Sequence, residues 1–484
     1  MAKEKPSSNS YRHILKYTGV FGGVQVFNIL IGLVRNKFVA ILLGPGGMGL
    51  VSLLNTSMNF ISQATGLGVS FSAVRQISEF HDKGDMPRLS HYISVVRQWS
   101  AIAALLGILV CIAAGPLLNA LSFSWGNHTI HFILLAPAVA MTAICGGELA
   151  ILKGTKRLKQ LASIQVITAL LSLVISIPLF YFFNYKAILP AIILTAMANM
   201  LPAVMASHSY HPYRLALRKG LVEDGKPMLR LGIAFTVAAA FTSGSDMMAR
   251  ALLNQVADLE TVGLFNAAYM ITITYSSMVF SSLESDFFPR LSAANHDNRQ
   301  VCDIVNRQIE VSLIVIAPLL AGLITALPIA LPLLFSKEFL PAASMAQTTA
   351  LAMFIKAMSL PIAYINLAKG NSRIYLTFES LYAIVFTASV IWSFKLFGLY
   401  GVGWAIVAVH ALELMALYVY ANKSFSLKLS SMTLNILAVN TPLLAIAYLS
   451  ATSLSGVAYW AIGIAATATA AAYTFKRLRD TRKA

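Results

Sequence analysis

Apolar residues gather in long runs along the chain, and short polar stretches separate these runs. Each run has about 20 residues or more, which is the length that an α-helix needs to cross a membrane. The longest polar stretches, about 208–228 and 289–307, are predicted to be loops, with or without a short surface helix. The pattern predicts fourteen membrane-spanning helices, at about 17–43, 47–73, 93–120, 131–152, 160–184, 187–207, 229–254, 261–287, 308–335, 341–367, 374–397, 400–421, 431–450 and 455–475.

Composition supports the same fold class, an all-α polytopic membrane protein. Of the 484 residues, 57% are apolar and only 11% are charged, which excludes an ordinary soluble domain. The three cysteines lie in or beside apolar spans without the spacing of metal ligands, so we expect neither a metal site nor a disulfide framework. The N-terminus has no cleavage site after a short apolar core, and we interpret it as a retained tail rather than a signal peptide.

The placement of charge predicts the orientation in the membrane. The net charge of +17 could suggest a nucleic-acid partner, but 29 of the 36 Lys and Arg residues lie in the N-terminus, the even-to-odd loops and the C-terminal tail. Only Lys186, Lys337 and Lys395 fall on the other side, and four more lie within spans. Because basic residues stay on the cytoplasmic side, we expect both termini in the cytoplasm and no nucleic-acid partner.

Short sequence echoes indicate an internal repeat. The segment GMGLVSLLN is echoed by TVGLFNAAY, and a Lys-Gly pair follows the fourth and the tenth spans. At nearly one constant offset along the chain, Gly49 matches Gly263, Lys153 matches Lys369, and Lys37 falls near Arg250. The halves, about 12–207 and 226–422, each contain six spans. An even number of crossings preserves orientation, so we expect the halves to be related by an axis along the membrane normal.

This repeat predicts three parts. Residues 1–225 form an N-terminal lobe with its following cytoplasmic loop, and residues 226–422 form a C-terminal lobe. Residues 423–484 add two helices and a basic tail outside the symmetry.

The stretch FVAILLGPGGMGLVSLLN, the lysine seven positions before its Gly-Pro, and the loops LKG-x-x-R and LAKG-x-x-R resemble the Wzx-type O-antigen and polysaccharide flippases. That superfamily also contains multidrug extrusion proteins and the lipid II flippase. The resemblance implies two six-helix lobes around a cationic cavity, which opens alternately to the two sides of the bacterial cytoplasmic (inner) membrane. It implies an undecaprenyl-diphosphate-linked glycan as substrate, a functional monomer surrounded by membrane lipids, and polysaccharide polymerase and chain-length proteins as partners.

Four cations lie inside spans and are the candidates for binding the diphosphate: Arg35, Lys37, Arg250 and Lys356. A charge at membrane depth is costly and is kept where it faces protein or water. Counting from Gly44 places Lys37 about 10 Å and Arg35 about 13 Å deep, so snorkelling to the surface is strained for Arg35. These two point to nearly opposite sides of the helix, so we expect only one of them in the cavity.

Two deep acids, Asp246 and Glu413, leave other interpretations open. Lys356 has the alternative of a structural ion pair with either acid, and Arg250 shares a helix face with Asp246. The same acids are candidates for coupling transport to a proton or sodium gradient. Four further acids lie near cytoplasmic helix ends, where we expect them to reach water: Glu148, Glu284, Asp286 and Glu379.

Neutral polar side chains within the first spans of each half are candidates for glycan contacts or, equally, for hydrogen bonds between helices. They are Gln25, Asn28, Asn55, Asn59 and Tyr269, with Gln63 and Tyr275 beside them. No phosphate-binding Gly loop, catalytic triad or metal cluster is present in the sequence, so no catalytic residue and no cofactor are predicted. The alternatives to a flippase are a multidrug or organic-cation antiporter and, less well supported because the outward loops are short, a membrane glycan polymerase or ligase.

Overall fold

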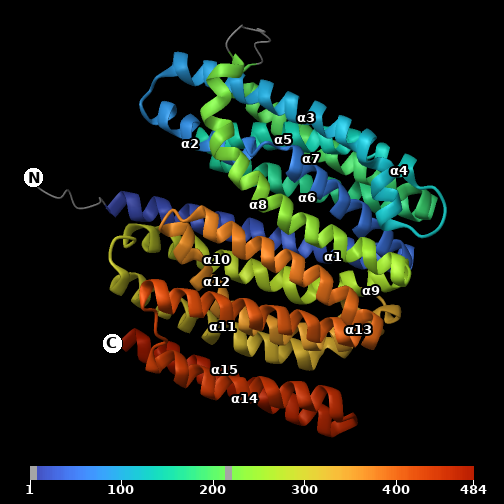
Figure 1. The fold of residues 1–484 in the computed structure, drawn as a ribbon, viewed down its shortest axis with the longest axis vertical. Helices are drawn as coiled ribbons and strands as arrows, with labels where there is room; N and C mark the ends of the chain where they lie inside the picture. The colour runs from blue at the N-terminus through green and yellow to red at the C-terminus, as the bar shows by residue number, and fades with distance from the viewer. Residues whose placement is uncertain (1–7, 213–220, 484) are drawn as a thin grey trace, which may run out of the picture. The chain divides into compact units, whose positions relative to one another are not determined.

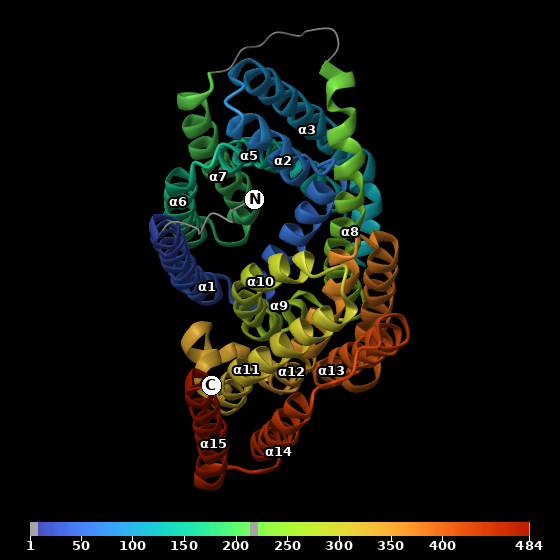
Figure 2. The same ribbon diagram turned by 90° about the vertical axis from the view of Figure 1, so that its left-hand side faces the viewer.

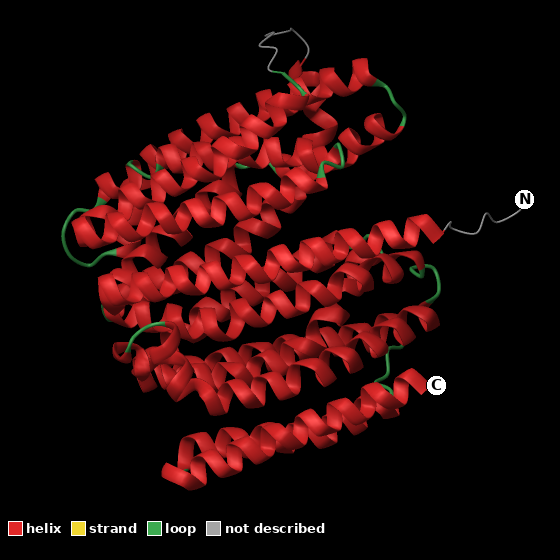
Figure 3. Cartoon of the chain, turned by 180° about the vertical axis from the view of Figure 1, so that it is seen from behind, coloured by secondary structure: helices red, strands yellow, loops and turns green. Residues whose placement is uncertain are grey.

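The computed structural model describes residues 8–212 and 221–483, and this part of the chain consists of helices joined by loops, with no strand (Figures 1 and 3). The helices form two compact units, Met1–Met247 and Met248–Ala484. The helices of the first unit are α1 (Ser8–Thr65), α2 (Val69–Asp82), α3 (Met86–Ser122), α4 (Thr129–Ile133), α5 (Ala136–Gly154), α6 (Leu158–Phe183), η1 (Asn184–Ala187), α7 (Ile188–Tyr210) and most of α8 (Leu221–Val256). The second unit holds the end of α8, then α9 (Leu259–Tyr269), η2 (Met270–Thr274), α10 (Tyr275–Ala293), α11 (Asn298–Leu334), η3 (Lys337–Ala342), α12 (Ala343–Ala368), α13 (Ser372–Phe425), α14 (Ser431–Ser453) and α15 (Gly456–Lys483).

These helices account for fourteen membrane crossings. Among the described residues, ten helical stretches are long and apolar enough to cross, or eleven when the bent α8 is included. Three of them have 39, 53 and 53 residues, about twice the length of one crossing. Each is divided once: Phe27–Thr65 at Gly44, Leu158–Tyr210 at η1, and Arg373–Phe425 at Gly398. The predicted all-α fold class with fourteen spans is therefore confirmed.

The break in α1 follows from its Gly-Pro-Gly-Gly sequence. Gly44 adopts φ 63°, which favours glycine, and Pro45 has no N–H to continue the helix. The Tyr185 hydroxyl donates to the carbonyl of Leu43 at 3.0 Å. A Cβ on Gly47 would lie 2.4 Å from the Leu43 Cβ, so a side chain there would force the turn open. The break thus ends one crossing and begins the next.

Within the first unit, α5 packs against α2, α3 and α7 (Figure 2). Small residues allow this close packing: a Cβ on Gly154 would meet Ile77 at 2.5 Å, and a Cβ on Gly147 would meet Ser100 at 2.0 Å. Within the second unit, α12 packs between α11 and α13, and α14 and α15 pack against α11. The Tyr459 hydroxyl of α15 donates to the Thr325 carbonyl of α11 at 2.7 Å.

The order of elements in α1 to α7 is repeated in α8 to α13. Helices α3 and α11 both have 37 residues and both begin after an aspartate cap, Asp85 and Asp297, whose side chain accepts from the first backbone N–H groups. The turn after α5 has a hydrogen bond from Arg157 N to Leu152 O, and the turn after α12 has its equivalent in the second half, from Asn371 N to Asn366 O. The two turns match at the offset that relates Gly49 to Gly263, which pairs Lys153 with Leu367, so the predicted match of Lys153 with Lys369 is two positions out of register.

Some predicted boundaries were wrong. The span predicted at 47–73 ends at Thr65, because Leu67 and Gly68 adopt left-handed φ angles of 53° and 64° and turn the chain into α2, which begins at Val69. The loop predicted at 208–228 is partly helical, since α8 begins at Leu221, and its basic residues Arg214, Arg218 and Lys219 lie outside the described residues. The division into parts 1–225, 226–422 and 423–484 stays a prediction.

Candidate functional site

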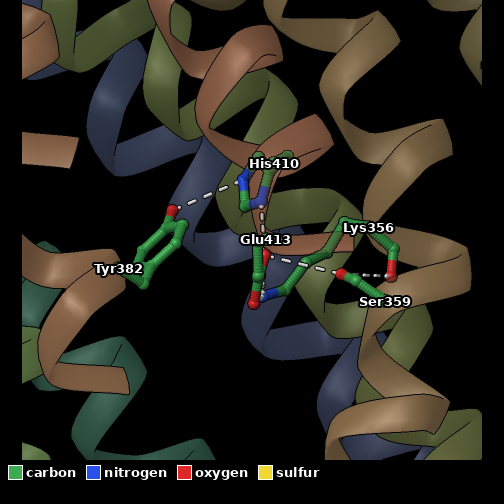
Figure 4. A network of polar contacts seen from close by, with 5 residues as sticks. All are labelled: Lys356, Ser359, Tyr382, His410 and Glu413. Atoms are coloured by element: carbon green, nitrogen blue, oxygen red, sulfur yellow. Dashed lines mark hydrogen bonds and ion pairs between the residues drawn. The ribbon is translucent and has the colours of Figure 1, made fainter. Parts of the chain in front are cut away.

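Lys356 lies near the middle of α12, about equally far from Ala343 and Ala368 at its two ends. Its Nζ donates to both carboxylate oxygens of Glu413 on α13, at 3.1 and 3.4 Å (Figure 4). The two side chains are 23% and 10% exposed. The structure thus brings together a predicted diphosphate ligand and a predicted coupling acid, in the ion pair that was the alternative interpretation of Lys356.

Glu413 is the centre of a larger polar network (Figure 4). His410 donates from Nδ1 to Glu413 Oε2 at 2.9 Å, because an ionised carboxylate can only accept. His410 Nε2 then accepts from the Tyr382 hydroxyl at 3.4 Å. The Lys356 ammonium lies 5.3 Å from the centre of the Tyr382 ring, a cation–π distance. We call Lys356, Glu413, His410 and Tyr382 the lysine network.

An ammonium group has three N–H donors, and the lysine network provides one carboxylate for them. Two more acids, Glu379 and Glu284, act electrostatically on Lys356. Glu284 Oε2 in turn accepts from the Tyr364 hydroxyl at 2.9 Å. The arrangement therefore places one positive charge among three carboxyl groups inside the second unit.

Arg35 lies on α1, in the crossing that ends at Gly44. Its Nε donates to the Ser176 hydroxyl of α6 at 3.3 Å, and Ser176 donates to the Ser172 carbonyl at 2.6 Å. The Ser176 hydroxyl is uncharged, so this hydrogen bond does not neutralise the positive charge of the Arg35 guanidinium. Lys37 of the same helix is also partly buried.

Arg250 lies near the end of α8 and is only 4% exposed. It donates to the Asn266 side-chain oxygen at 3.3 Å. Its guanidinium carbon lies 5.0 Å from the centre of the Tyr269 ring and 5.3 Å from that of Phe265. The predicted diphosphate ligand Arg250 and the predicted glycan contact Tyr269 are thus neighbours, packed as a cation over an aromatic face.

The remaining predicted glycan contacts are dispersed. Asn55 donates to the Val51 carbonyl of its own helix at 2.8 Å, so its amide supports α1. The Asn28 side-chain oxygen is buried without a hydrogen-bond partner in the protein. The side chain of Gln25 lies outside the described part of the molecule. Asn59 and the predicted coupling acid Asp246 line one cavity of the first unit.

Sequence reasoning missed Arg97 of α3. Its Nε and Nη2 donate to the two carboxylate oxygens of Glu148 at 2.9 and 3.2 Å, and Nη2 also reaches the Ser207 hydroxyl at 3.2 Å. These charged side chains are 7% and 1% exposed. The expectation that Glu148 reaches water was therefore wrong, because α3 and α7 enclose it. The sequence did contain an indication of this buried charge, because Arg97 lies just inside the span predicted at 93–120. It was counted instead with the cytoplasmic basic residues that flank the spans.

His211 follows the end of α7, outside the membrane-spanning helices, at the rim of this buried pair. Burial lowers its pKa, and the positive charges of Arg97 and Arg157 lower it further. Protonation of His211 is therefore less favourable in the folded protein than for a free histidine.

Comparison with known proteins gives three kinds of likeness. A family model described as "Polysaccharide biosynthesis protein" matches residues 38–344. The lipid III flippase of Escherichia coli (strain K12) is 21% identical over 394 residues, which cover 78% of this chain and 91% of that protein, and the lipid III flippase of Shigella flexneri matches equally.

Solved structures resemble the chain in fold. An inward-facing multidrug resistance MATE family transporter of the MOP superfamily has a TM-score of 0.70 at 16% identity, over 82% of this chain and 94% of the other. The lipid II flippase MurJ, in an inward closed conformation, has a TM-score of 0.66 at 14% identity, over 95% of this chain and 99% of the other.

Proposed function

The chain belongs to the family of polysaccharide biosynthesis proteins, and we propose that it is a flippase for a polyprenyl-diphosphate-linked oligosaccharide. Support comes from the lipid III flippases, which share 21% of their residues with it over most of both lengths. The function is transport and not catalysis. The substrate moves from the cytoplasmic to the periplasmic leaflet of the inner membrane by alternating access. Both termini of the chain are proposed to lie in the cytoplasm.

The observation that carries this proposal is the position of Lys356. A lysine at the centre of a membrane helix is expensive, and Glu413 offsets its charge. A pair of buried charges seldom stabilises more than apolar residues of the same volume would, so the stability of the fold does not explain it. A diphosphate needs cations in a low-dielectric passage, and Lys356 supplies one that Glu413 neutralises until the substrate arrives.

The cations Arg35, Lys37 and Arg250 are proposed to act on the same diphosphate. Asp246 and Glu413 are proposed to carry the coupling proton or sodium ion. The glycan is a repeat unit of a surface polysaccharide such as O-antigen or enterobacterial common antigen. Polymerase and chain-length proteins receive it after transport, and one copy of the chain suffices.

The test is transport by the purified protein in liposomes. The probe is undecaprenyl diphosphate bearing one N-acetylhexosamine, and translocation is the fraction that becomes protected from an added glycosidase. We expect Arg35→Ala to slow translocation by about tenfold or more, because a charge-assisted contact to phosphate is lost. Arg35→Lys should keep part of the rate, since the charge remains while the bidentate geometry is lost.

Ser176→Ala is the matched control, because it removes the hydroxyl partner of Arg35 without changing charge. A rate near that of the wild type is expected for it. If the wild type moves tetraphenylphosphonium and leaves the lipid-linked probe in place, the flippase proposal is wrong and the organic-cation antiporter takes its place.

A further inference from the structure

The first unit contains two adjoining cavities between α1, α2, α3, α5 and α8, and both are lined by Gln63 and Ala239. The inner cavity has a volume of about 260 Å³ and the outer one about 500 Å³. We call the two together the polar crevice. Its inner walls include Ser62, Ser100, Thr236, Phe71 and Phe235, and its outer walls include Thr56, Asn59, Thr242, Ser243 and Asp246.

Three hydroxyl groups in the inner cavity lack a hydrogen-bond partner in the protein. They belong to Ser62 on α1, Ser100 on α3 and Thr236 on α8. Serine and threonine inside helices normally bond to a carbonyl one turn back, as Thr142 beside them does with Ala138 at 2.8 Å. A buried hydroxyl without a partner is unfavourable, and it reaches a new partner by rotation about one side-chain bond. Three of them along one cavity point to a polar ligand.

Two aromatic rings line the same cavity. Phe71 and Phe235 have ring centroids 3.8 Å apart, and they are 56% and 37% exposed. Their apolar faces are therefore accessible beside the hydroxyl groups. A sugar ring has this combination of needs, because its hydroxyls require hydrogen bonds and its C–H faces pack against apolar surface.

Charge separates this crevice from the cations that are proposed to hold the diphosphate. Its lining residues include no lysine or arginine, and Asp246 is the one charged side chain among them. An anion would meet no cation among these lining residues, whereas a neutral glycan would meet hydroxyl and amide groups. The amides of Asn59 and Gln63 are both exposed at the outer cavity.

We propose that the polar crevice binds a sugar residue of the lipid-linked glycan. The proposal rests on the flippase function and adds a division of labour to it. The cations hold the diphosphate, and Ser62, Ser100 and Thr236 donate to and accept from sugar hydroxyls. Phe71 and Phe235 pack against the sugar face, so the crevice selects for the glycan and not for the lipid carrier.

The test compares two probes on the purified full-length protein in nanodiscs. One is undecaprenyl diphosphate bearing one N-acetylhexosamine, and the other is undecaprenyl diphosphate without sugar. The variant combines Ser62→Ala, Ser100→Ala and Thr236→Val. We expect it to bind the sugar-bearing probe about tenfold more weakly or worse, while binding of the sugar-free probe is unchanged. Ser94→Ala, on α3 but outside the crevice, is the control and should bind both probes as the wild type does.

A second variant fills the inner cavity instead of removing hydroxyls. Ala103→Leu adds bulk at a lining residue of α3. It should also weaken only the sugar-bearing probe, and thermal unfolding near the wild-type temperature shows that it folds.

The outcomes separate this inference from the function on which it rests. A wild type that binds neither probe overturns the flippase proposal itself. If the wild type binds both probes, the flippase proposal stands. The sugar site alone is then wrong if the triple variant binds both probes as the wild type does, or if it loses affinity for both to the same extent. If tetraphenylphosphonium binds and Asp246→Asn abolishes that binding, while neither probe competes with it, the crevice is a cation site and the inference is wrong.

Discussion

The two units build corresponding helices with different interiors. In the second unit, Lys356 of α12 pairs with Glu413 of α13. The corresponding positions of the first unit, in α5 and α7 and at the offset that relates Gly49 to Gly263, are Thr142 and Asn199, which carry no charge. The rest of the network is replaced too: Ala196 corresponds to His410 and Thr168 to Tyr382. The first unit therefore forms the same pair of helices without a lysine network.

The first unit has its own buried ion pair at other positions. Arg97 of α3 corresponds to Ile309 of the second unit, at the offset that relates the caps Asp85 and Asp297. Glu148 of α5 corresponds to Ile362, at the offset that relates Gly49 to Gly263. Both isoleucines are buried. Each unit thus replaces the other's ion pair by uncharged residues, so neither pair is a requirement of the shared fold.

The two pairs differ in what surrounds them, which suggests different roles. Glu148 is enclosed and Arg97 has a second partner in Ser207, so this pair ties α3, α5 and α7 together. The Lys356 side chain is 23% exposed and has further acids beside it. The comparison favours a role in stability for the first pair, and transport stays the proposed role of the second.

Breaking the structural pair should have the largest effect. Arg97→Ile alone leaves the Glu148 carboxylate buried without its cation, and Glu148→Ile alone does the same to Arg97. Each should lower the free energy of unfolding by about 3–5 kcal/mol. The double variant installs the residues of the second unit and should recover most of that loss, with transport retained. Thermal unfolding of the purified proteins measures this, and single variants as stable as the wild type would contradict it.

Replacement of the charged pair of the lysine network should leave stability nearly unchanged and slow transport. Lys356→Thr with Glu413→Asn installs the residues of the first unit and removes both charges together. We expect unfolding near the wild-type temperature but translocation slower by about 10- to 100-fold, equivalent to one lost charge-assisted contact of about 1.5–3 kcal/mol. The measurement is the liposome assay with thermal unfolding alongside. Normal translocation by a well-folded double variant would make this pair structural as well.

The sequence was sufficient for the fold class and its family. Apolar runs predict the spans, Gly44 and Pro45 predict the break in α1, and short echoes predict the repeat. The resemblance to the polysaccharide flippases is confirmed, since the family model covers residues 38–344. Helix ends were less predictable, because the left-handed turn at Leu67 and Gly68 interrupts a run that is apolar on both sides.

The contacts of the site could be predicted only in part. The position of Lys356 at the middle of a span indicates a buried charge, but the choice between Glu413 and Asp246 depends on which helices face each other. Periodicity cannot decide that. The unpartnered hydroxyls of Ser62 and Ser100 were missed for a related reason, because serines are common in membrane helices and only the cavity distinguishes these two.

The aspartate caps test whether corresponding positions of the two units contribute equally to the free energy of unfolding. Asp85 accepts from Arg88 N at 3.1 Å, and Asp297 accepts from Arg299 N at 2.8 Å. Replacement of either by alanine should cost about 1 kcal/mol of stability, because an end donor of the helix loses its acceptor. Similar losses for Asp85→Ala and Asp297→Ala in thermal unfolding would support matched units. A loss confined to one cap would break the correspondence at this position.

The smallest expected effect is a pH dependence at the rim of the structural pair. Burial and the positive charges of Arg97 and Arg157 lower the pKa of His211 in the folded state, so protonation is easier after unfolding. The folded state therefore loses stability relative to the unfolded one as the pH falls below about 6.5, the ordinary pKa of histidine. His211→Gln cannot take up this proton. Between about pH 7.5 and about pH 5.5, a window that brackets that ordinary value, the unfolding temperature of the wild type should fall further than that of the variant. Burial is the first cause of the lowered pKa, and Arg97 and Glu148 act on it in opposite directions. His211→Gln should therefore reduce the pH dependence by a similar amount in the isoleucine double variant, whereas disappearance of its effect there would make the ion pair, and not burial, the cause.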